Sequence, residues 1–151
     1  MNTDIQERAT FKLCDYSLKV QDYQQILVWA KELNEDPEHI FEKLEEAEYQ
    51  AYESDTVKLE IKGSAIVKLV WDFNELPINN FRWIDNLSIA TIVFKNGVGN
   101  ENLSLNLPAL RRLYCAENNL KNIELDNTPE LRLLDCSENS LTSLSLENIG
   151  K

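Results

Sequence analysis

The sequence predicts an α/β-type repeat fold, α+β overall: a solenoid of about four coils with a parallel strand ladder, preceded by a helical-hairpin cap. A pattern of leucine, cysteine and asparagine begins at Leu110 and returns after 21 residues at Leu131. Looser versions of the pattern begin at Ile66 and at Ile89. Two segments with the apolar spacing of amphipathic helices precede all four units.

The N-terminal region, residues 1–56, is expected to hold the two-helix cap. Its first part, residues 1–21, shows a weak apolar alternation that suits one or two short strands. The first helix is expected over residues 23–34, with Asp22 as its N-cap. The apolar residues at helical spacing are Tyr23, Ile26, Leu27, Ala30 and Leu33.

The second helix is expected over residues 37–52. Asp36 is a suitable N-cap, and Pro37 suits the first helical position because proline lacks the N–H that would be unpaired there. An apolar face opposite a row of glutamates makes this helix amphipathic. The apolar face contains Ile40, Phe41, Leu44, Ala47 and Ala51.

The solenoid is expected over residues 57–151, although its first part has two interpretations. Apolar residues alternate on both sides of Gly63, and this alternation is typical of a β-hairpin. The repeat template fits the same stretch from Ile66 onward and includes Asn74 at the asparagine position. On the template, residues 59–61 are the return half of an incomplete opening turn.

The two clean units share the pattern L-x-x-L-x-C-x-x-N-x-L-x-x-L-x-L. Because side chains alternate along a strand, the leucine and cysteine of each strand point inward, where a free cysteine acts as a small apolar residue. An asparagine at the turn can pair with backbone groups that the turn leaves unpaired. The expected core columns are Leu69/Ile92/Leu113/Leu134 and Trp71/Phe94/Cys115/Cys136.

Residues 108–149 resemble the short bacterial leucine-rich repeats of about 21 residues, on the pattern just given, and residues 66–107 are a looser match. The resemblance therefore covers residues 66–149 and leaves the N-terminal segment unmatched. It implies a leucine-rich-repeat solenoid that recognises a protein partner through its concave strand face. The main functional hypothesis is a non-enzymatic protein–protein interaction module.

The outward residues of the predicted strands identify the expected partner-binding face. Val70, Val93 and Tyr114 are expected to form an exposed apolar stripe, which is typical of an interaction surface, and tyrosine and arginine are frequent binding anchors. The alternative is that the N-terminal segment or a loop folds over the stripe. The expected concave-face site residues are Val70, Phe73, Val93, Lys95, Arg112, Tyr114 and Asp135.

Acidic residues concentrate in one segment. Residues 32–55 contain ten acidic residues and one basic residue, so they hold nine of the eleven net negative charges of the chain. An acidic helix is either a solvated face or a docking surface for a basic partner. The alternative function is therefore a small acidic inhibitor that blocks a nucleic-acid-binding protein by imitating nucleic acid, without binding nucleic acid itself. The expected contact residues are Glu38, Glu42, Glu45, Glu46 and Glu48.

The last coil indicates a possible homodimer. The sequence shows no polar capping segment after the fourth unit, and an open sheet edge with an apolar ring favours a cover. A symmetric dimer would supply one. The expected dimer residues are Leu141, Leu144 and Leu146.

The residue types needed for catalysis are few. His39 is the single histidine, and three cysteines without C-x-x-C spacing predict neither a zinc site nor a disulfide framework. We expect no catalytic residues, no cofactor and no metal. The sequence also lacks an apolar run that could span a membrane and a secretory signal, so we expect a cytoplasmic protein with no membrane contact.

Overall fold

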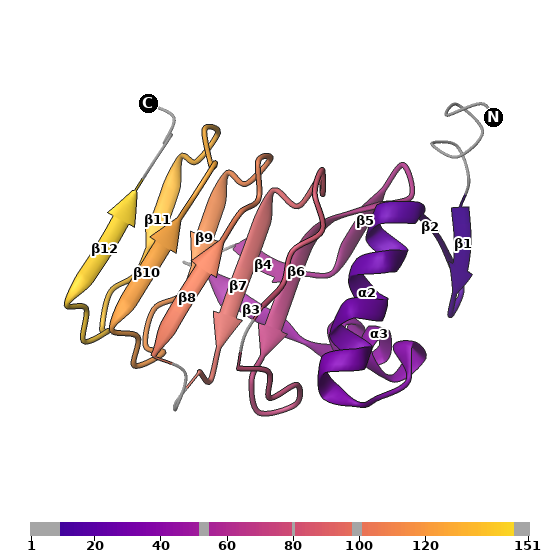
Figure 1. Ribbon diagram of the computed structural model, residues 1–151, viewed down its shortest axis with the longest axis horizontal. Helices are drawn as coiled ribbons and strands as arrows, with labels where there is room; N and C mark the ends of the chain where they lie inside the picture. The colour runs from indigo at the N-terminus through magenta and orange to yellow at the C-terminus, as the bar shows by residue number, and fades with distance from the viewer. Residues whose placement is uncertain (1–9, 52–54, 80, 98–100, 147–151) are drawn as a thin grey trace.

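A computed structural model, which describes residues 10–51, 55–79, 81–97 and 101–146, shows a β-solenoid of about three turns with two helices at one end (Figure 1). The first elements are β1 (Thr10–Leu13), β2 (Tyr16–Lys19), α2 (Val20–Leu33), α3 (Pro37–Glu46), β3 (Glu48–Ala51) and β4 (Asp55–Lys58). The solenoid strands are β5 (Glu60–Lys62), β6 (Ala65–Asp72), β7 (Thr91–Lys95), β8 (Asn102–Leu105), β9 (Arg112–Tyr114), β10 (Asn122–Leu125), β11 (Leu133–Asp135) and β12 (Ser143–Leu146).

The solenoid is built from two sheets. The five-stranded sheet has the order β11-β9-β7-β6-β5, and its strands β6, β7, β9 and β11 are parallel. The three-stranded sheet has the order β12-β10-β8, and all its strands are parallel. Each of the four expected units supplies a strand to the first sheet. The described residues between β6 and β7 contain no strand of the second sheet, so the structure shows about three turns, and the expected four coils are not confirmed.

The repeat alignment predicts the strand register correctly. Leu69 is paired with Ile92, and Ile92 with Leu113, in parallel register, and all three side chains are buried between the sheets. Because successive side chains of a strand point to opposite faces, the next residues along, Val70 and Val93, form a column on the other side of the sheet. We term that side the outer face.

Asparagine side chains connect successive coils at the turn after each strand. Asn118 Oδ1 accepts a hydrogen bond from the backbone N–H of Gly97 at 2.8 Å. One coil later, Asn139 Oδ1 accepts hydrogen bonds from the backbone N–H groups of Asn118 and Leu120, both at 2.9 Å. The structural role expected for the repeat asparagines is confirmed at these two positions.

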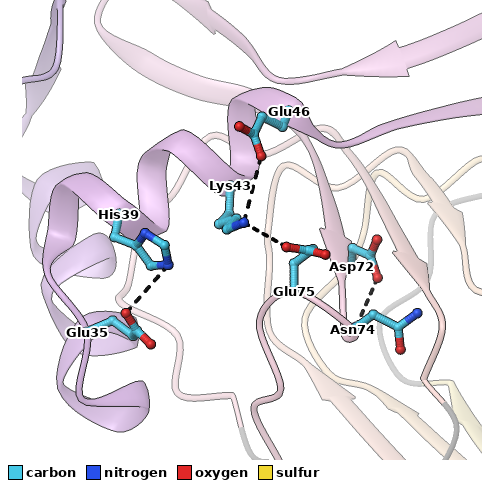
Figure 2. A network of polar contacts seen from close by, with 7 residues as sticks. All are labelled: Glu35, His39, Lys43, Glu46, Asp72, Asn74 and Glu75. Atoms are coloured by element: carbon cyan, nitrogen blue, oxygen red, sulfur yellow. Dashed lines mark hydrogen bonds and ion pairs between the residues drawn. The ribbon is translucent and has the colours of Figure 1, made fainter.

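Asn74, at the same position of the first unit, does not share this role. Its side chain is exposed, and its backbone N–H donates a hydrogen bond to Asp72 Oδ1 at 2.9 Å (Figure 2). Asp72 Oδ1 also accepts a hydrogen bond from Asn96 Nδ2 at 2.9 Å. An aspartate, and not an asparagine, therefore holds the turn of the first unit.

The two helices lie beside the first strands of the solenoid (Figure 1). The indole of Trp29, in α2, packs against that of Trp71, in β6, with ring centroids 4.8 Å apart. Ile40 and Phe41 of α3 are fully buried in the same core cluster, which continues through the coils. The helices thus occupy the place expected for an N-terminal cap.

Helix α2 begins earlier than expected. Lys19 is its N-cap residue, so Asp22, the expected N-cap, lies in the first turn. The Asp22 carboxylate is buried and accepts a hydrogen bond from the backbone N–H of Ile66 at 3.0 Å. The aspartate therefore connects the helix to β6 instead of capping the helix.

Helix α3 begins at Pro37, as expected, but ends at Glu46 and not at residue 52. Ala47 is already extended, with ψ at 138°, and β3 follows it. Tyr49 of β3 pairs in antiparallel register with Val57 of β4. The helical spacing of Ala47 and Ala51 led to the wrong prediction, because two alanines at that spacing also fit a strand that pairs with a neighbour.

Both interpretations of the stretch around Gly63 are correct, for different residues. Strand β5 pairs with β6 in antiparallel register, so residues 59–61 are not the return half of a coil. Gly63 and Ser64 both have positive φ, 56° and 64°, which is the geometry of a tight hairpin turn. The later part of β6 then pairs in parallel with β7, as the repeat template predicts.

The weak alternation within residues 1–21 is also explained. β1 and β2 form an antiparallel pair. Phe11 stacks on Tyr23 of α2 with ring centroids 5.0 Å apart, and Tyr16 contacts Phe41 of α3 at 5.3 Å. The pair therefore packs on both helices.

Candidate protein-binding face

The expected apolar stripe exists on the outer face but is not exposed. Val70, Val93 and Tyr114 are adjacent in the parallel register of β6, β7 and β9. The two valines have no exposed surface and Tyr114 is 2% exposed. The expectation of an exposed stripe is therefore wrong. We term these three residues the outer stripe.

The chain itself covers the outer stripe. Ala51 of β3 and Val57 of β4, both 2% exposed, belong to one buried cluster with the three stripe residues. Tyr49 packs against this cluster, and its ring lies 5.8 Å from that of Tyr114 at an interplanar angle of 43°. Figure 1 shows the β3–β4 hairpin crossing the sheet at β6 and β7. The alternative considered from the sequence, that another segment folds over the stripe, is the observed arrangement.

The other side of the β3–β4 hairpin is polar. Glu48 lies opposite Lys58 in the register, and their side chains form an ion pair at 3.7 Å. Gln50 lies opposite Thr56, whose hydroxyl donates a hydrogen bond to Gln50 Oε1 at 2.6 Å. The hairpin is therefore an amphipathic ribbon with apolar residues toward the sheet and polar pairs toward solvent.

Lys95 contacts the hairpin through a polar group. Its Nζ donates a hydrogen bond to the backbone carbonyl of Glu48 at 3.2 Å. Lys95 was expected to contact a partner, and in the structure it contacts a segment of its own chain. The β3–β4 hairpin forms a separate two-stranded sheet, so side chains and not a shared strand ladder hold it on the outer face.

Beyond the stripe, part of the outer face is accessible. Arg112 is exposed, and its neighbour on the next strand, Leu133, is half-buried. Asp135, which pairs with Tyr114, is also half-buried. Asp135 Oδ1 accepts hydrogen bonds from the backbone N–H and the hydroxyl of Ser137, at 3.2 and 2.7 Å. These residues border the covered stripe on the side of β11.

Phe73 does not belong to the outer face. It is 8% exposed and packs inside the main core, where its ring lies 5.9 Å from that of Phe94 and 6.0 Å from that of Phe81. The assignment of Phe73 to the concave face is therefore wrong. The repeat template assigned Phe73 to the outward column that follows the strand, but the strand ends at Asp72 and Phe73 turns to the same side as Trp71.

The acidic residues of α3 form an exposed row. Glu38, Glu42, Glu45 and Glu46 are all exposed on the helix. Glu48 does not belong to the helix, because it lies on β3 and pairs with a lysine.

Lys43, the single lysine of this helix, pairs with two carboxylates. Its Nζ lies 2.8 Å from Glu75 Oε1 and 3.9 Å from Glu46 Oε1 (Figure 2). The hydrogen bond to Glu75 and the charge of that carboxylate raise the pKa of Lys43. On the preceding turn, His39 Nε2 lies 3.5 Å from Glu35 Oε1 (Figure 2). The helix therefore presents mainly negative charge to solvent.

The acidic row influences Cys14. The thiol lies next to α3, with Sγ 3.9 Å from the backbone oxygen of Glu38. Burial raises the pKa of Cys14, and the negative charges of Glu42 and Glu45 raise it further. Burial also raises the pKa of Cys115, to about 12. Both thiols are therefore protonated at neutral pH, which suits packing rather than nucleophilic chemistry.

The expected dimer residues lie at the last strands. Leu141 is half-buried and packs against the main core. Leu144 and Leu146 belong to β12, where they pair in register with Ile123 and Leu125, and their side chains lie outside the described part. In the described part of the chain, β11 and β12 are the outermost strands of their sheets at this end.

Comparison of the chain with known protein families, with functionally described proteins and with solved structures gives no match. Over residues 10–51, 55–79, 81–97 and 101–146, no group of three or more histidine, cysteine, aspartate or glutamate side chains could hold a metal ion. Within the same residues, neither helix is long and apolar enough to cross a membrane.

Proposed function

We propose that the protein is a non-enzymatic, cytoplasmic recognition module of the leucine-rich-repeat type, which binds a protein partner on the outer face of its five-stranded sheet. One observation carries the proposal: an aligned apolar stripe on this face already holds a polypeptide segment, the β3–β4 hairpin. A surface that packs closely on one extended segment has the shape and chemistry to pack on another.

The accessible residues beside the stripe support the same proposal. Arg112 is exposed and Leu133 is half-buried, and the two are neighbours in register. Arginine is a frequent anchor of protein interfaces, and the half-buried leucine beside it offers apolar contact area. A partner that reaches across β9 and β11 would contact both residues together with the border of the outer stripe.

Selection from a random-peptide phage library, with the purified chain as bait, tests the proposal. We expect enriched peptides whose affinity falls at least tenfold in Arg112→Glu/Leu133→Glu, because both changes alter the accessible part of the outer face. The matched control is Glu42→Lys/Glu45→Lys, which changes two residues on α3. Peptides that bind both variants and the original chain equally would contradict the proposal.

A second candidate is the small acidic inhibitor that blocks a nucleic-acid-binding protein. The observation that favours it is the row Glu38, Glu42, Glu45 and Glu46, next to a lysine already paired with carboxylates. A partner captured from the native host through this row should dissociate at about 0.5 M salt, because screening weakens exposed charge pairs. Duplex DNA should compete for that partner. Glu42→Lys/Glu45→Lys should abolish capture, whereas Arg112→Glu/Leu133→Glu should not.

The homodimer through Leu141, Leu144 and Leu146 also remains a proposal. Light scattering on the purified chain tests it. A dimer that becomes monomeric in Leu141→Glu would support the expected contact, and a monomeric original chain would contradict it.

A further inference from the structure

The β3–β4 hairpin occupies the surface that the proposed function assigns to a partner, and the further inference rests on that function. We propose that the hairpin is a displaceable occupant of the outer stripe, and that the partner presents an extended segment of similar pattern. In such a segment, an aromatic and small aliphatic side chains alternate with polar ones.

The inner side of the hairpin shows which side chains the outer stripe accepts. Tyr49 packs its ring against Tyr114, while Ala51 and Val57 are almost completely buried on the stripe. Tyr49 and Ala51 are separated by one polar residue, so both point toward the sheet. A partner segment with an aromatic residue and a small aliphatic residue two positions apart would make the same contacts.

The way in which the hairpin is held makes its release possible. Among the described residues, its strands form a two-stranded sheet with each other and do not join the ladder of the five-stranded sheet. A two-stranded hairpin without packing partners is marginally stable in water, so its order depends on the contacts with the stripe. Release of the hairpin would therefore leave every hydrogen bond of the two solenoid sheets in place.

The connections of the hairpin also suit release as a unit. Ala47 alone separates it from α3, and Leu59 alone separates it from β5. Both neighbouring elements are fixed independently of the hairpin: α3 by its buried Ile40, Phe41 and Leu44, and β5 by its pairing with β6. A segment that is not part of a larger hydrogen-bonded sheet can open locally at a lower free energy than the elements around it.

A synthetic peptide with the sequence of residues 47–59 provides the probe. It is titrated into the original chain and into Tyr49→Ser/Val57→Ser, whose own hairpin has lost two inner contacts while the stripe is unchanged. Only molecules whose hairpin has left the stripe can bind the peptide, so the apparent affinity is the intrinsic affinity multiplied by the fraction of such molecules. Because this fraction is larger in the variant, we expect the variant to bind the peptide at least about tenfold more tightly than the original chain. The control is Glu48→Gln/Thr56→Ser, which changes outward residues of the same strands and should bind like the original chain.

Hydrogen exchange gives an independent measurement on the unmodified protein. We expect the amides of β3 and β4 to exchange at least tenfold faster than those of β6 and β7. The difference should increase when the residue 47–59 peptide is added to Tyr49→Ser/Val57→Ser, because the peptide then occupies the outer stripe in place of the hairpin. Near-ultraviolet circular dichroism confirms that this variant keeps the folded core around Trp29 and Trp71. Equal protection of the hairpin and the sheet, with no peptide binding by the folded variant, would overturn the inference.

The two proposals fail in different ways. If phage-selected peptides bind through Arg112 and Leu133 while the hairpin stays protected, the protein is a recognition module and the hairpin is a fixed part of it. If the residue 47–59 peptide binds the opened variant but no library peptide binds any form, the hairpin is displaceable and the proposed function fails.

Discussion

The side-chain oxygen of Asn139 accepts a hydrogen bond from the backbone N–H of Asn118. One coil earlier, the side-chain oxygen of Asn118 accepts one from the backbone N–H of Gly97 in the same way. The amide groups of both asparagines also donate hydrogen bonds to carbonyls of the preceding coil, Asn118 to Phe94 at 2.7 Å and Asn139 to Cys115 at 2.9 Å. The series ends at Gly97, which has no side chain to hold the unit before it. In the first unit, Asp72 Oδ1 instead accepts the hydrogen bonds of the turn, from the Asn74 backbone N–H and from Asn96 Nδ2.

Asn118→Ala should lower the free energy of unfolding by about 2–4 kcal/mol, because Asn118 is 1% exposed and its loss leaves several buried backbone groups without partners. Urea unfolding followed by circular dichroism measures the change. The matched control is Asn74→Ala, at the exposed equivalent position, which should change stability by less than about 0.5 kcal/mol. Equal losses would show that the asparagine positions of all units are alike.

Gly97→Ala should also destabilise the protein, by about 1–3 kcal/mol, because a packed site must shift to accept an added methyl group. A Cβ at residue 97 would lie 2.9 Å from Asn118 Oδ1, the atom that accepts the hydrogen bond of Gly97. Thermal unfolding of Gly97→Ala and Asn118→Ala, singly and together, tests this explanation. We expect the combined loss to be smaller than the sum of the two single losses, and full additivity would contradict the explanation.

Leu113→Ala should lower the free energy of unfolding by about 2–5 kcal/mol, the usual range for a fully buried leucine. Leu113 lies between the sheets without exposed surface, whereas Leu133 is half-buried on the outer face. Leu133→Ala, the chemically identical control, should lower it by about 1 kcal/mol or less. The reverse order in urea unfolding would mean that the two faces of the five-stranded sheet are wrongly assigned.

Asp22 should make stability depend on pH in a direction opposite to that of most carboxylates. Burial raises its pKa in the folded protein, although the Ile66 N–H and Lys19 oppose the shift. A raised pKa means that the folded state favours the protonated form, so the ionised carboxylate at neutral pH lowers stability. The original chain should therefore gain stability relative to Asp22→Asn as the pH falls through the raised pKa to the ordinary value of 3.8.

Urea unfolding of the original chain and of Asp22→Asn, at the same series of pH values between neutral and acidic, measures the difference in their free energies of unfolding. The contribution of all other carboxylates is common to both chains and cancels in this difference. A difference that is constant with pH would show that Asp22 has an ordinary pKa. The offset at neutral pH is not informative, because the amide introduced by Asp22→Asn changes hydrogen bonding as well as charge.

Cys14 should react slowly with a thiol reagent, because a raised pKa reduces the fraction of thiolate. Glu42→Gln/Glu45→Gln should accelerate its reaction at pH 8 by removing two negative charges that raise the pKa. Glu101→Gln/Glu124→Gln, which changes two acids on distant coils, is the control and should leave the rate unchanged. Cys115 should not react until the protein unfolds, and a rate for Cys14 that is independent of all four glutamates would refute the electrostatic cause.

The spacing of the repeat was sufficient to predict which residues of neighbouring strands are paired. The period of 21 residues aligns Leu113 with Leu134 and Tyr114 with Asp135, and both pairs are found in the register. In a parallel ladder to which each coil adds one strand, residues that are one period apart in the sequence are neighbours in space. This equivalence explains why the core columns were predictable without any coordinates.

The cover on the outer face could not be predicted in the same way. Tyr49 and Val57 pair with each other and pack on a sheet that lies later in the chain, so no local period describes their contact with Tyr114. Residues 48–51 also continued the spacing of the preceding helix. The signal that was present is the alternation Glu48-Tyr49-Gln50-Ala51, in which polar and apolar residues exchange at every step.

The antiparallel strand β5 limits where further coils can be added to the solenoid. A further coil placed before β6 would need the edge of β6 that β5 already occupies, and it would have to displace the helices that cover the same end. Coils can instead be added or removed between β7 and β11 without disturbing that junction, provided that the 21-residue step is kept. Length variants of this architecture should therefore share the N-terminal cap and first strand and differ in the number of later coils.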